Sequence, residues 1–201
     1  TFRLKLRWDD ELPQPLKNKV RLWVKSLHRI EDLKIPRFAL LQPTDKIAIS
    51  QLHSFSDASK ACSGANIYLR VEYTDGTIHV RLIASRNRLA PLNGLTIPRL
   101  ELNAMTLAAR LSNMVEREIN IPINEKHYWS DSRAALGFIR NQATRFQVYV
   151  ATRAAEIQAT TDIENWHYVP TALNPADPLS RGEIPESLAE YYDGPPFLYQ
   201  S

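Results

Sequence analysis

The sequence predicts an α/β domain built on a five-stranded mixed sheet, preceded by a helical extension. Two observations carry this prediction. Three consecutive strand patterns lie within residues 47–84, and residues 100–169 then alternate amphipathic helix patterns with two further short strand patterns. Three antiparallel strands followed by strands that alternate with helices are typical of a mixed sheet whose faces are covered by helices.

The length of 201 residues and an apolar content of 44% fit one domain of ordinary size with a hydrophobic core. The single cysteine, Cys62, excludes an intrachain disulfide framework and cysteine-rich zinc sites, and it favours a reducing compartment. Because no apolar run approaches the length of a membrane-spanning helix, we expect no membrane partner. The start at Thr1, without Met and without a signal-peptide pattern, predicts a fragment of a longer protein.

The net charge of +3 hides an asymmetry between two parts of the chain. Residues 1–150 contain 23 Lys and Arg against 14 Asp and Glu, whereas residues 151–201 contain 2 against 8. A basic surface attracts polyanions because phosphate neutralisation releases counterions. Many proteins that bind no nucleic acid carry a similar surplus on their solvated surface, so charge alone leaves both interpretations open.

Residues 1–45 are predicted to form the extension. Apolar side chains recur there at helical spacing, which predicts an amphipathic helix from about Pro15 to Leu33, ended by Pro36. The apolar stripe of this helix comprises Leu16, Val20, Trp23, Leu27 and Ile30. Such a stripe needs an apolar surface to cover, so we expect the helix to pack on the body of the protein.

The first three strands begin the predicted main domain, residues 46–182. The first strand covers Ile47 to Phe55 and ends at Ser56-Asp57-Ala58-Ser59. The second alternates cleanly over residues 67–73, and the third over residues 78–84. Asp75-Gly76 between them is a strong hairpin signal because Gly tolerates positive φ, so these two strands are predicted to be antiparallel neighbours.

The remaining elements follow a loop over residues 90–98. A long helix has its apolar positions from Leu100 to Val115, and a fourth strand covers residues 126–130. Helical segments over residues 132–142 and 146–160 then precede a fifth strand at 166–169 and a loop that carries Asp177. The Pro-rich tail, residues 183–201, is expected to lie along the surface.

Four carboxylates occupy the ends of these elements. Asp57 follows the first strand, Glu101 begins the long helix, Asp131 follows the fourth strand and Asp177 follows the fifth. Two of them have simpler explanations, because Asp131 can cap the next helix and Glu101 can favour a helix N-terminus without catalysis. If the first and fourth strands are neighbours, however, the carboxylates form a cluster that is costly unless a cation neutralises it.

Oxygen ligands alone suit Mg²⁺ or Mn²⁺. Two such ions held about 3.5–4 Å apart can activate a water and stabilise the leaving oxygen in phosphodiester hydrolysis. Chemistry of this kind needs no covalent nucleophile from the protein.

Four short motifs resemble the acidic motifs of ribonuclease H, in the same order along the chain. The first three are Ser56-Asp57-Ala58-Ser59, Arg99-Leu100-Glu101-Leu102 and Ser130-Asp131-Ser132. The segment Asn174-Pro175-Ala176-Asp177-Pro178-Leu179-Ser180-Arg181 is similar to the fourth motif in long-terminal-repeat retrotransposons. Any one motif is weak, but the ordered set is specific.

The flanks narrow the resemblance to the domain between reverse transcriptase and integrase in BEL/Pao-type polyproteins. They are Trp8-Asp9-Asp10-Glu11-Leu12-Pro13, Ile35-Pro36-Arg37 and Tyr192-Asp193-Gly194-Pro195-Pro196-Phe197-Leu198. The similarity therefore spans nearly the whole chain.

This resemblance implies a ribonuclease H-like fold and a metal-dependent endoribonuclease that hydrolyses the RNA strand of RNA–DNA hybrids during reverse transcription. It implies that Asp57, Glu101, Asp131 and Asp177 bind two Mg²⁺ ions, for which Mn²⁺ can substitute. The implied partners are the hybrid and the covalently linked reverse transcriptase and integrase. The implied location is the cytoplasmic retroelement particle or the nucleus.

A hybrid presents 2′-hydroxyls in a broad minor groove, which polar residues near the metals can test while basic residues hold phosphates. The candidates for these contacts are Ser59, Arg86, Arg88 and Arg99. Each of them is equally an ordinary surface residue.

One departure from the family concerns histidine. Many ribonucleases H carry a mobile His before the fourth acid, but aligning Trp166-His167-Tyr168-Val169 with the last strand puts Ala172 near that position. We therefore expect the product-release His to be absent and His167 to have a structural role in the strand. Trp23, Trp129 and Trp166 are predicted to pack in the core rather than to stack on bases.

Three other functions stay open. A non-catalytic tether or nucleic-acid clamp could have kept the fold, although the presence of all four acids argues against it. An integrase-like or resolvase-like nuclease would cut DNA, but the Asp-Glu-Asp-Asp order and spacing favour the hybrid nuclease. A domesticated host protein with a new partner is the third.

Overall fold

The computed structural model describes residues 5–31, 34–37, 39–92, 94–142, 146–185 and 187–200. The chain divides into two compact units, residues 1–35 and residues 36–201. In the described part of the chain, no helix is both long and apolar enough to cross a membrane.

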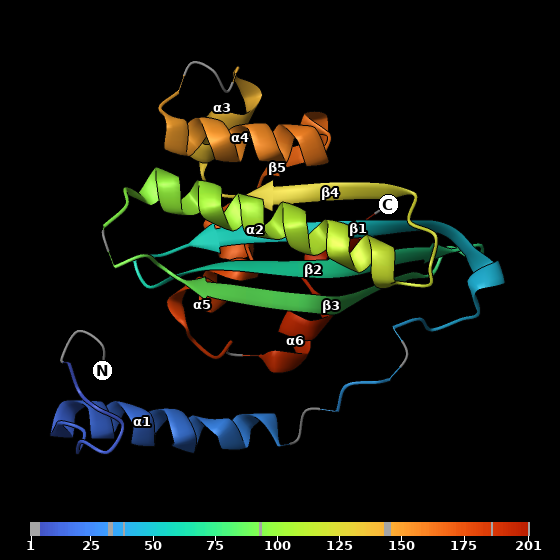
Figure 1. Ribbon diagram of the computed structural model, residues 1–201. Coiled ribbons are helices and arrows are strands. Elements are labelled where there is room, and N and C mark those ends of the chain that lie inside the picture. Colours follow the sequence, from blue (N-terminus) through green and yellow to red (C-terminus); the bar gives the residue numbers. More distant parts are fainter. Residues whose placement is uncertain are drawn as a thin grey trace. The chain divides into compact units, whose positions relative to one another are not determined.

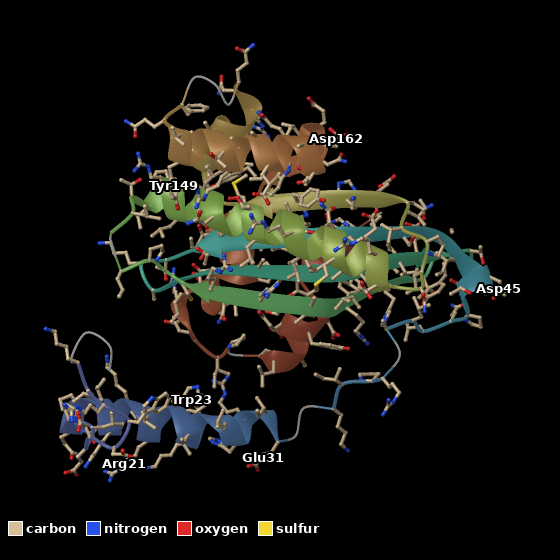
Figure 2. All side chains as sticks on the ribbon, viewed as in Figure 1. Arg21, Trp23, Glu31, Asp45, Tyr149 and Asp162 are labelled. Atoms are coloured by element: carbon tan, nitrogen blue, oxygen red, sulfur yellow. The ribbon has the colours of Figure 1, made fainter. Side chains whose placement is uncertain are left out.

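The first unit contains helix α1, Gln14–Ser26, followed by a 3₁₀ turn, Leu27–Ile30 (Figure 1). The predicted amphipathic helix is thus present, while Leu33 at its expected end lies outside the described residues. No residue of α1 is buried, and Trp23, labelled in Figure 2, is 59% exposed. The packing of this helix on the body of the protein stays a prediction.

The second unit is built on a five-stranded sheet with the strand order β3-β2-β1-β4-β5 (Figure 1). The strands are β1 Ile47–Ala58, β2 Cys62–Tyr73, β3 Ile78–Leu89, β4 Glu125–Ser130 and β5 Trp166–Tyr168. β2 pairs antiparallel with both β1 and β3, whereas β4 lies parallel to both β1 and β5. The predicted mixed sheet is therefore confirmed, with β1 and β4 as direct neighbours at its centre.

The predicted hairpin between β2 and β3 is also confirmed. Its turn is closed by a hydrogen bond of 2.9 Å from the Gly76 N–H to the Tyr73 carbonyl. The Asp75 carboxylate accepts a further bond of 2.9 Å from the Thr77 N–H. The turn residues thus satisfy their own polar groups at an exposed end of the sheet.

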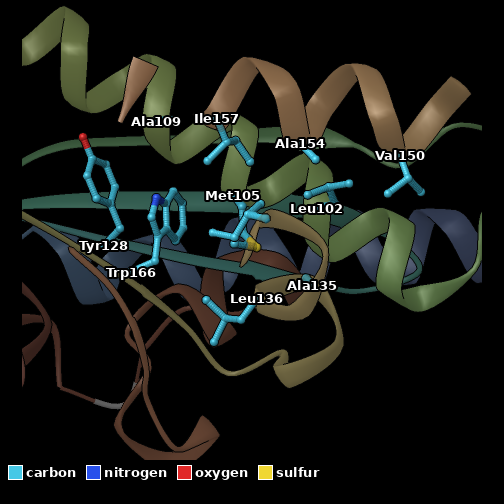
Figure 3. Close-up of a cluster of buried hydrophobic side chains, with 11 residues drawn as sticks. Leu102, Met105, Ala109, Tyr128, Ala135, Leu136, Val150, Ala154, Ile157 and Trp166 are labelled. Carbon is cyan, nitrogen blue, oxygen red and sulfur yellow. The ribbon is translucent and has the colours of Figure 1, made fainter. Parts of the chain in front are cut away.

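Helices α2 (Ile97–Glu118), α3 (Arg133–Arg140) and α4 (Val148–Thr160) cover one face of the sheet. The inner side of α2 lies on β1 and β2, where its Ala108, Leu111 and Val115 pack with Leu52 and Val71. Figure 3 shows the neighbouring cluster, in which side chains from all three helices surround strand residues of β4 and β5. The members of this second cluster are Leu102, Met105, Ala109, Tyr128, Ala135, Leu136, Ile139, Val150, Ala154, Ile157 and Trp166.

The C-terminal part of the chain covers the opposite face. Phe55 belongs to the cluster on that face and Leu52 to the cluster under α2, as expected for strand residues an odd number apart. Short helices α5 (Ala176–Arg181) and α6 (Leu188–Asp193) lie there, followed by a 3₁₀ turn, Pro196–Tyr199. Further 3₁₀ turns elsewhere in the unit are Thr44–Lys46, Ile163–Asn165 and Thr171–Leu173.

The described tail residues are mostly exposed or half-buried, as expected of a tail along the surface, but Pro195 and Leu198 are buried against the sheet. Leu198 is buried in the cluster with Phe55, and the Leu198 carbonyl accepts a hydrogen bond of 2.7 Å from the Arg70 Nε. Gly194 has a φ of +81°, and a Cβ there would lie 2.9 Å from the Tyr68 ring. The tail can therefore approach the sheet this closely only with Gly at position 194.

Candidate metal centre

The parallel strands β1 and β4 end side by side and bring two carboxylates together. Asp57 is the penultimate residue of β1, not the residue after it, because β1 stays paired with β2 as far as Ala58. Ser56 of β1 pairs with Ser130 of β4, so Asp131 leaves the sheet beside Asp57. Asp57 is 5% exposed, and Asp131 is half-buried.

Asp131 does not cap the helix that follows it. The N-cap of α3 is Ser132, whose hydroxyl accepts a hydrogen bond of 3.2 Å from the Ala135 N–H. The Asp131 carboxylate instead accepts a bond of 2.6 Å from the Thr171 hydroxyl. The simpler explanation of Asp131 as a helix cap is therefore wrong.

Glu101 lies further along its helix than the sequence pattern indicated, and its side chain is buried. It is the fifth residue of α2, and no acidic residue lies in the first turn, so interaction with the helix N-terminus does not explain it. Leu100 and Ala104 pack against Ala58, which holds this part of α2 on the end of β1. Glu101 is 6% exposed, and its Oε2 has no hydrogen-bond partner in the described part of the chain.

The carboxylates of Asp57, Glu101 and Asp131 form one group. Each offers an oxygen, and the three oxygens all lie within 4.8 Å of one another. Burial, followed by the charges of Asp57 and Asp131, raises the pKa of Glu101 to about 9. Burial is also the main cause that raises the pKa of Asp57 to about 6, with smaller contributions from the charges of Asp131 and Asp177.

These three residues fit a hard divalent cation. Ligands bound to one Mg²⁺ lie at most about 4.2 Å apart, which is twice the Mg–O distance, so only small movements would close the group around an ion. The donors are oxygen only, as Mg²⁺ and Mn²⁺ prefer. The unpartnered Glu101 oxygen is a buried acceptor that such an ion would satisfy.

Asp177 is close to this group but does not belong to it in this arrangement. It lies in α5 rather than in a loop, and its Oδ1 is 2.9 Å from Nη2 of Arg181, one helical turn later. Its charge nevertheless makes a small contribution to the raised pKa values of Asp57 and Glu101. The structure thus brings together three of the four predicted acids and places the fourth beside them.

A comparison with protein families agrees with this fold. The family model described as "Pao retrotransposon-like RNaseH-like domain" matches residues 1–132, well over half of the chain. The chain belongs to this family. Among curated proteins, none matches the chain closely enough to be called a relative.

Several solved structures of RNase H resemble this Pao-type domain at low identity. The N-terminal RNase H domain of a Mycobacterium tuberculosis protein is 15% identical with a TM-score of 0.39, over 66% of this chain and 91% of that chain. RNase H1 of Halobacterium salinarum is 16% identical with a TM-score of 0.31, over 63% of this chain and 90% of that chain. LC11-RNase H1, solved in complex with an RNA/DNA hybrid, is 15% identical with a TM-score of 0.32, over 67% of this chain and 96% of that chain.

The candidate substrate contacts of the Pao-type domain lie around the same end of the sheet. Asp57 pairs with Gly64 of β2, and Gly64 pairs with Asn87 of β3, which lies between Arg86 and Arg88. At about 4.8 Å per strand, these exposed arginines lie two strands, about 10 Å, from Asp57. Their role in binding stays a prediction.

Ser59 and Arg99 already have partners within the protein. The Ser59 hydroxyl donates to the Ser180 carbonyl at 2.7 Å, which ties the β1–β2 turn to α5. The Arg99 side chain donates to Gln147 at 2.8 Å, and its guanidinium lies 5.6 Å from the centroid of the Tyr149 ring. Both residues are half-buried, and a role of either in substrate binding stays a prediction.

Sequence reasoning missed three groups of polar residues at the site. Thr171 binds Asp131, and Ser180 binds Asp57. The third group surrounds Tyr149, labelled in Figure 2, whose ring lies 3.7 Å from the Arg153 guanidinium and whose hydroxyl accepts a bond of 2.8 Å from Asn103. Thr171 and Ser180 follow the fifth strand within or near the fourth acidic motif, which was the one signal that could have identified them.

His167 lies within β5, as predicted, and packs among other rings. Its Nε2 is 3.4 Å from Nδ1 of His127, and its ring centroid is 4.9 Å from that of Trp129. Burial lowers its pKa. Residues 170–177 contain no His, so the segment that approaches Asp131 offers the Thr171 hydroxyl there and no imidazole.

Proposed function

We propose that this chain is a metal-dependent endoribonuclease that hydrolyses the RNA strand of RNA–DNA hybrids during reverse transcription of a retroelement. The observation that carries the proposal is the convergence of Asp57, Glu101 and Asp131 from three separate elements. The group raises two pKa values and leaves a buried oxygen unpartnered, so it does not stabilise the fold by itself. A bound cation explains why such a group is present.

The three grouped acids, together with Asp177, would hold the ions, and Mg²⁺ is the expected metal. When bound, two such ions supply Lewis-acid activation of a water and stabilisation of the leaving oxygen. The chain itself contributes four carboxylates and the groups that orient them. Thr171, for example, fixes one oxygen of Asp131 through a bond of 2.6 Å.

Basic residues near this end of the sheet support a nucleic-acid substrate. A cavity of about 440 Å³ between the end of β3, α2 and α4 is lined by Arg88, Arg110, Arg153 and Tyr149. Glu156 is the acidic residue that lines it, and it pairs with Arg110, so the lining is positively charged overall. Such a surface suits the phosphates of a duplex whose RNA strand reaches the carboxylates.

The family implies a polyprotein context. In that context the chain would be covalently linked to a reverse transcriptase and an integrase, and it would act in cytoplasmic retroelement particles or in the nucleus. These assignments rest on the family alone. They add a source for the substrate, because a linked reverse transcriptase produces RNA–DNA hybrids.

The test is a cleavage assay with uniformly labelled RNA–DNA, RNA–RNA and DNA–DNA duplexes in Mg²⁺ and in EDTA. We expect cleavage of the RNA strand of the hybrid, in Mg²⁺ or Mn²⁺ only. Cleavage of DNA–DNA would favour a DNA nuclease of the same fold. Binding of the hybrid without cleavage under any metal condition would favour a non-catalytic clamp.

A further inference from the structure

The segment that carries Asp177 is fastened to the end of β1 at several points. The Asn174 side-chain amide donates to the Ser56 carbonyl at 3.0 Å. The Ser180 hydroxyl donates to Oδ2 of Asp57, and the Asp177 carbonyl lies 3.0 Å from the same hydroxyl as its alternative acceptor. The segment is thus attached to β1 both before and after Asp177.

Ser180 is held in place from all sides. Its residue is 0% exposed, and its carbonyl accepts hydrogen bonds of 2.7 Å from the Ser59 hydroxyl and from the Cys62 thiol. A Cβ on Gly64 would lie 3.0 Å from the side chain of Leu179, so α5 lies as near to β2 as glycine allows. The position of the Ser180 hydroxyl is therefore set by packing and backbone contacts, and does not depend on its hydrogen bond to Asp57.

We propose that Ser180 is a positioning residue that orients the Asp57 carboxylate for a divalent cation, an inference that rests on the proposed metal-dependent function. A carboxylate at the end of a strand can rotate about its terminal torsion, and the Ser180 hydroxyl is the buried side-chain donor that, with the backbone N–H of Ala58, fixes the plane of the two Asp57 oxygens. With Oδ2 held by Ser180, Asp57 presents its remaining acceptor sites toward Glu101 and Asp131.

The same hydrogen bond links Asp57 of β1 to helix α5, which carries Asp177. Ser180 and Asp177 lie three residues apart in α5, so the contact that fixes Asp57 also fixes the helix that carries the fourth acid. Loss of the hydroxyl should loosen both. A hydrogen bond to a charged group accounts for about 10- to 100-fold in a binding constant.

The experiment measures Mn²⁺ and Mg²⁺ binding to the full chain by titration calorimetry, and kcat and KM for the hybrid as functions of metal concentration. Ser180→Ala is expected to raise the metal Kd about 10-fold or more. The KM for the hybrid should stay unchanged, because Ser180 lies beneath the carboxylates and not on a basic surface. Ser180→Thr, which keeps a hydroxyl, should restore part of the affinity.

Ser54→Ala is the matched control. Ser54 is also 0% exposed and lies on the same strand as Asp57, but its hydroxyl has no hydrogen-bond partner among the described residues. This variant should leave the metal Kd unchanged. In an Asp57→Asn background, Ser180→Ala should add no further loss of metal affinity, because the carboxylate it orients is already gone.

The outcomes separate this inference from the proposed function. A wild-type chain that binds Mn²⁺ but cleaves no hybrid, with weaker binding in Ser180→Ala, would remove the proposed nuclease activity and leave Ser180 as a positioning residue. A folded Ser180→Ala chain whose metal Kd lies within about twofold of wild type would overturn the inference, even if hybrid cleavage is observed. A wild-type chain without any divalent-cation binding would overturn both.

Discussion

In the metal-free protein the Glu101 carboxylate lies in an unfavourable environment. Its carboxylate is 6% exposed, one oxygen lacks a partner within the described chain, and two other carboxylates lie within 4.8 Å. The sequence could predict that Glu101 belongs to the site, because its motif is the second in an ordered set of acidic motifs. It could not predict the pKa of about 9, because that value depends on how α2 packs against Ala58.

Asp131→Asn is expected to abolish hybrid cleavage and to stabilise the metal-free protein. The substitution removes the charge of a ligand at nearly constant volume. Metal ions contribute several kcal/mol to such a transition state, so activity should fall by about 1000-fold or more. Removing the Asp131 charge also relieves its repulsion of Glu101 and Asp57, so the Tm in EDTA should rise.

Asp45→Asn serves as the control for this variant. It makes the same chemical change away from the acidic group, in the 3₁₀ turn Thr44–Lys46 before β1. It should leave cleavage unchanged. Full cleavage by a folded Asp131→Asn chain is incompatible with the proposed centre.

His167→Ala should reduce turnover by less than the ~100-fold typical of losing a general acid or base. The imidazole lies inside β5 against Trp129 and His127, so its loss leaves a gap in a ring cluster and lowers stability. Thermal melts and pH–rate profiles distinguish the two effects. A stable variant that still binds hybrid and metal but has lost the pH dependence of cleavage would show that the alignment of this strand is wrong.

At the level of elements, sequence patterns identified the five strands and the helices of eight or more residues, and missed the short helices α5 and α6. β2 and β3 alternate over enough residues for the period of two to be visible, and α2 repeats its apolar face over 22 residues. Helices α5 and α6 have six residues each, less than two turns, so they carry no readable period. The position of Asp177 in a helix and the packing of the tail could therefore not be predicted.

Gly194→Ala tests the packing of the tail on the sheet. A side chain at φ +81° is strained, and its Cβ would lie 2.9 Å from the Tyr68 ring. Strain and overpacking together should destabilise the chain by about 2–4 kcal/mol, which corresponds to a fall in Tm of roughly 5–15 °C. Differential scanning calorimetry measures both.

Gly137→Ala is the control for this variant. Gly137 lies within α3, where an added Cβ meets nothing within 4 Å, so Ala should leave the Tm unchanged or raise it slightly. An unchanged Tm for Gly194→Ala would mean that the tail does not pack on Tyr68 in solution.

At the level of the whole molecule, the charge asymmetry of the sequence has a structural counterpart. Residues 151–201 contain 2 Lys and Arg against 8 Asp and Glu, and this segment supplies Asp177 and the cover of one sheet face. The basic residues are spread over residues 1–150, and three of them, Arg86, Arg88 and Arg99, lie in β3 and α2. Composition could predict this surplus but not its location, because strand register decides which arginines lie at the end of the sheet that carries Asp57.

The metal-free protein should lose stability as the pH rises from 7 to 9. An acid whose pKa is raised by folding binds more protons in the native state, so stability falls between its unfolded and folded pKa values. For Glu101 this window runs from 4.5 to about 9, and for Asp57 from 3.8 to about 6. Below pH 6.5 the buried His53, whose pKa is lowered to about 3, acts in the opposite direction, as do His79 and His167, whose pKa values burial lowers. Burial raises the pKa of the Cys62 thiol from 9.0, so near pH 9 Cys62 adds a smaller loss of the same sign to that of Glu101.

In EDTA, the free energy of unfolding should therefore fall by up to about 1.4 kcal/mol per pH unit in this window. Saturating Mg²⁺ should raise the Tm, and its apparent affinity should increase with pH because binding displaces the Glu101 proton. Glu101→Gln should remove most of the slope, whereas Glu118→Gln, the same change at an exposed position of α2, should keep it. A Tm in EDTA that stays constant or rises from pH 7 to 9 in the wild-type chain would show that Glu101 is ionised without metal, and that its neighbours do not hold it protonated.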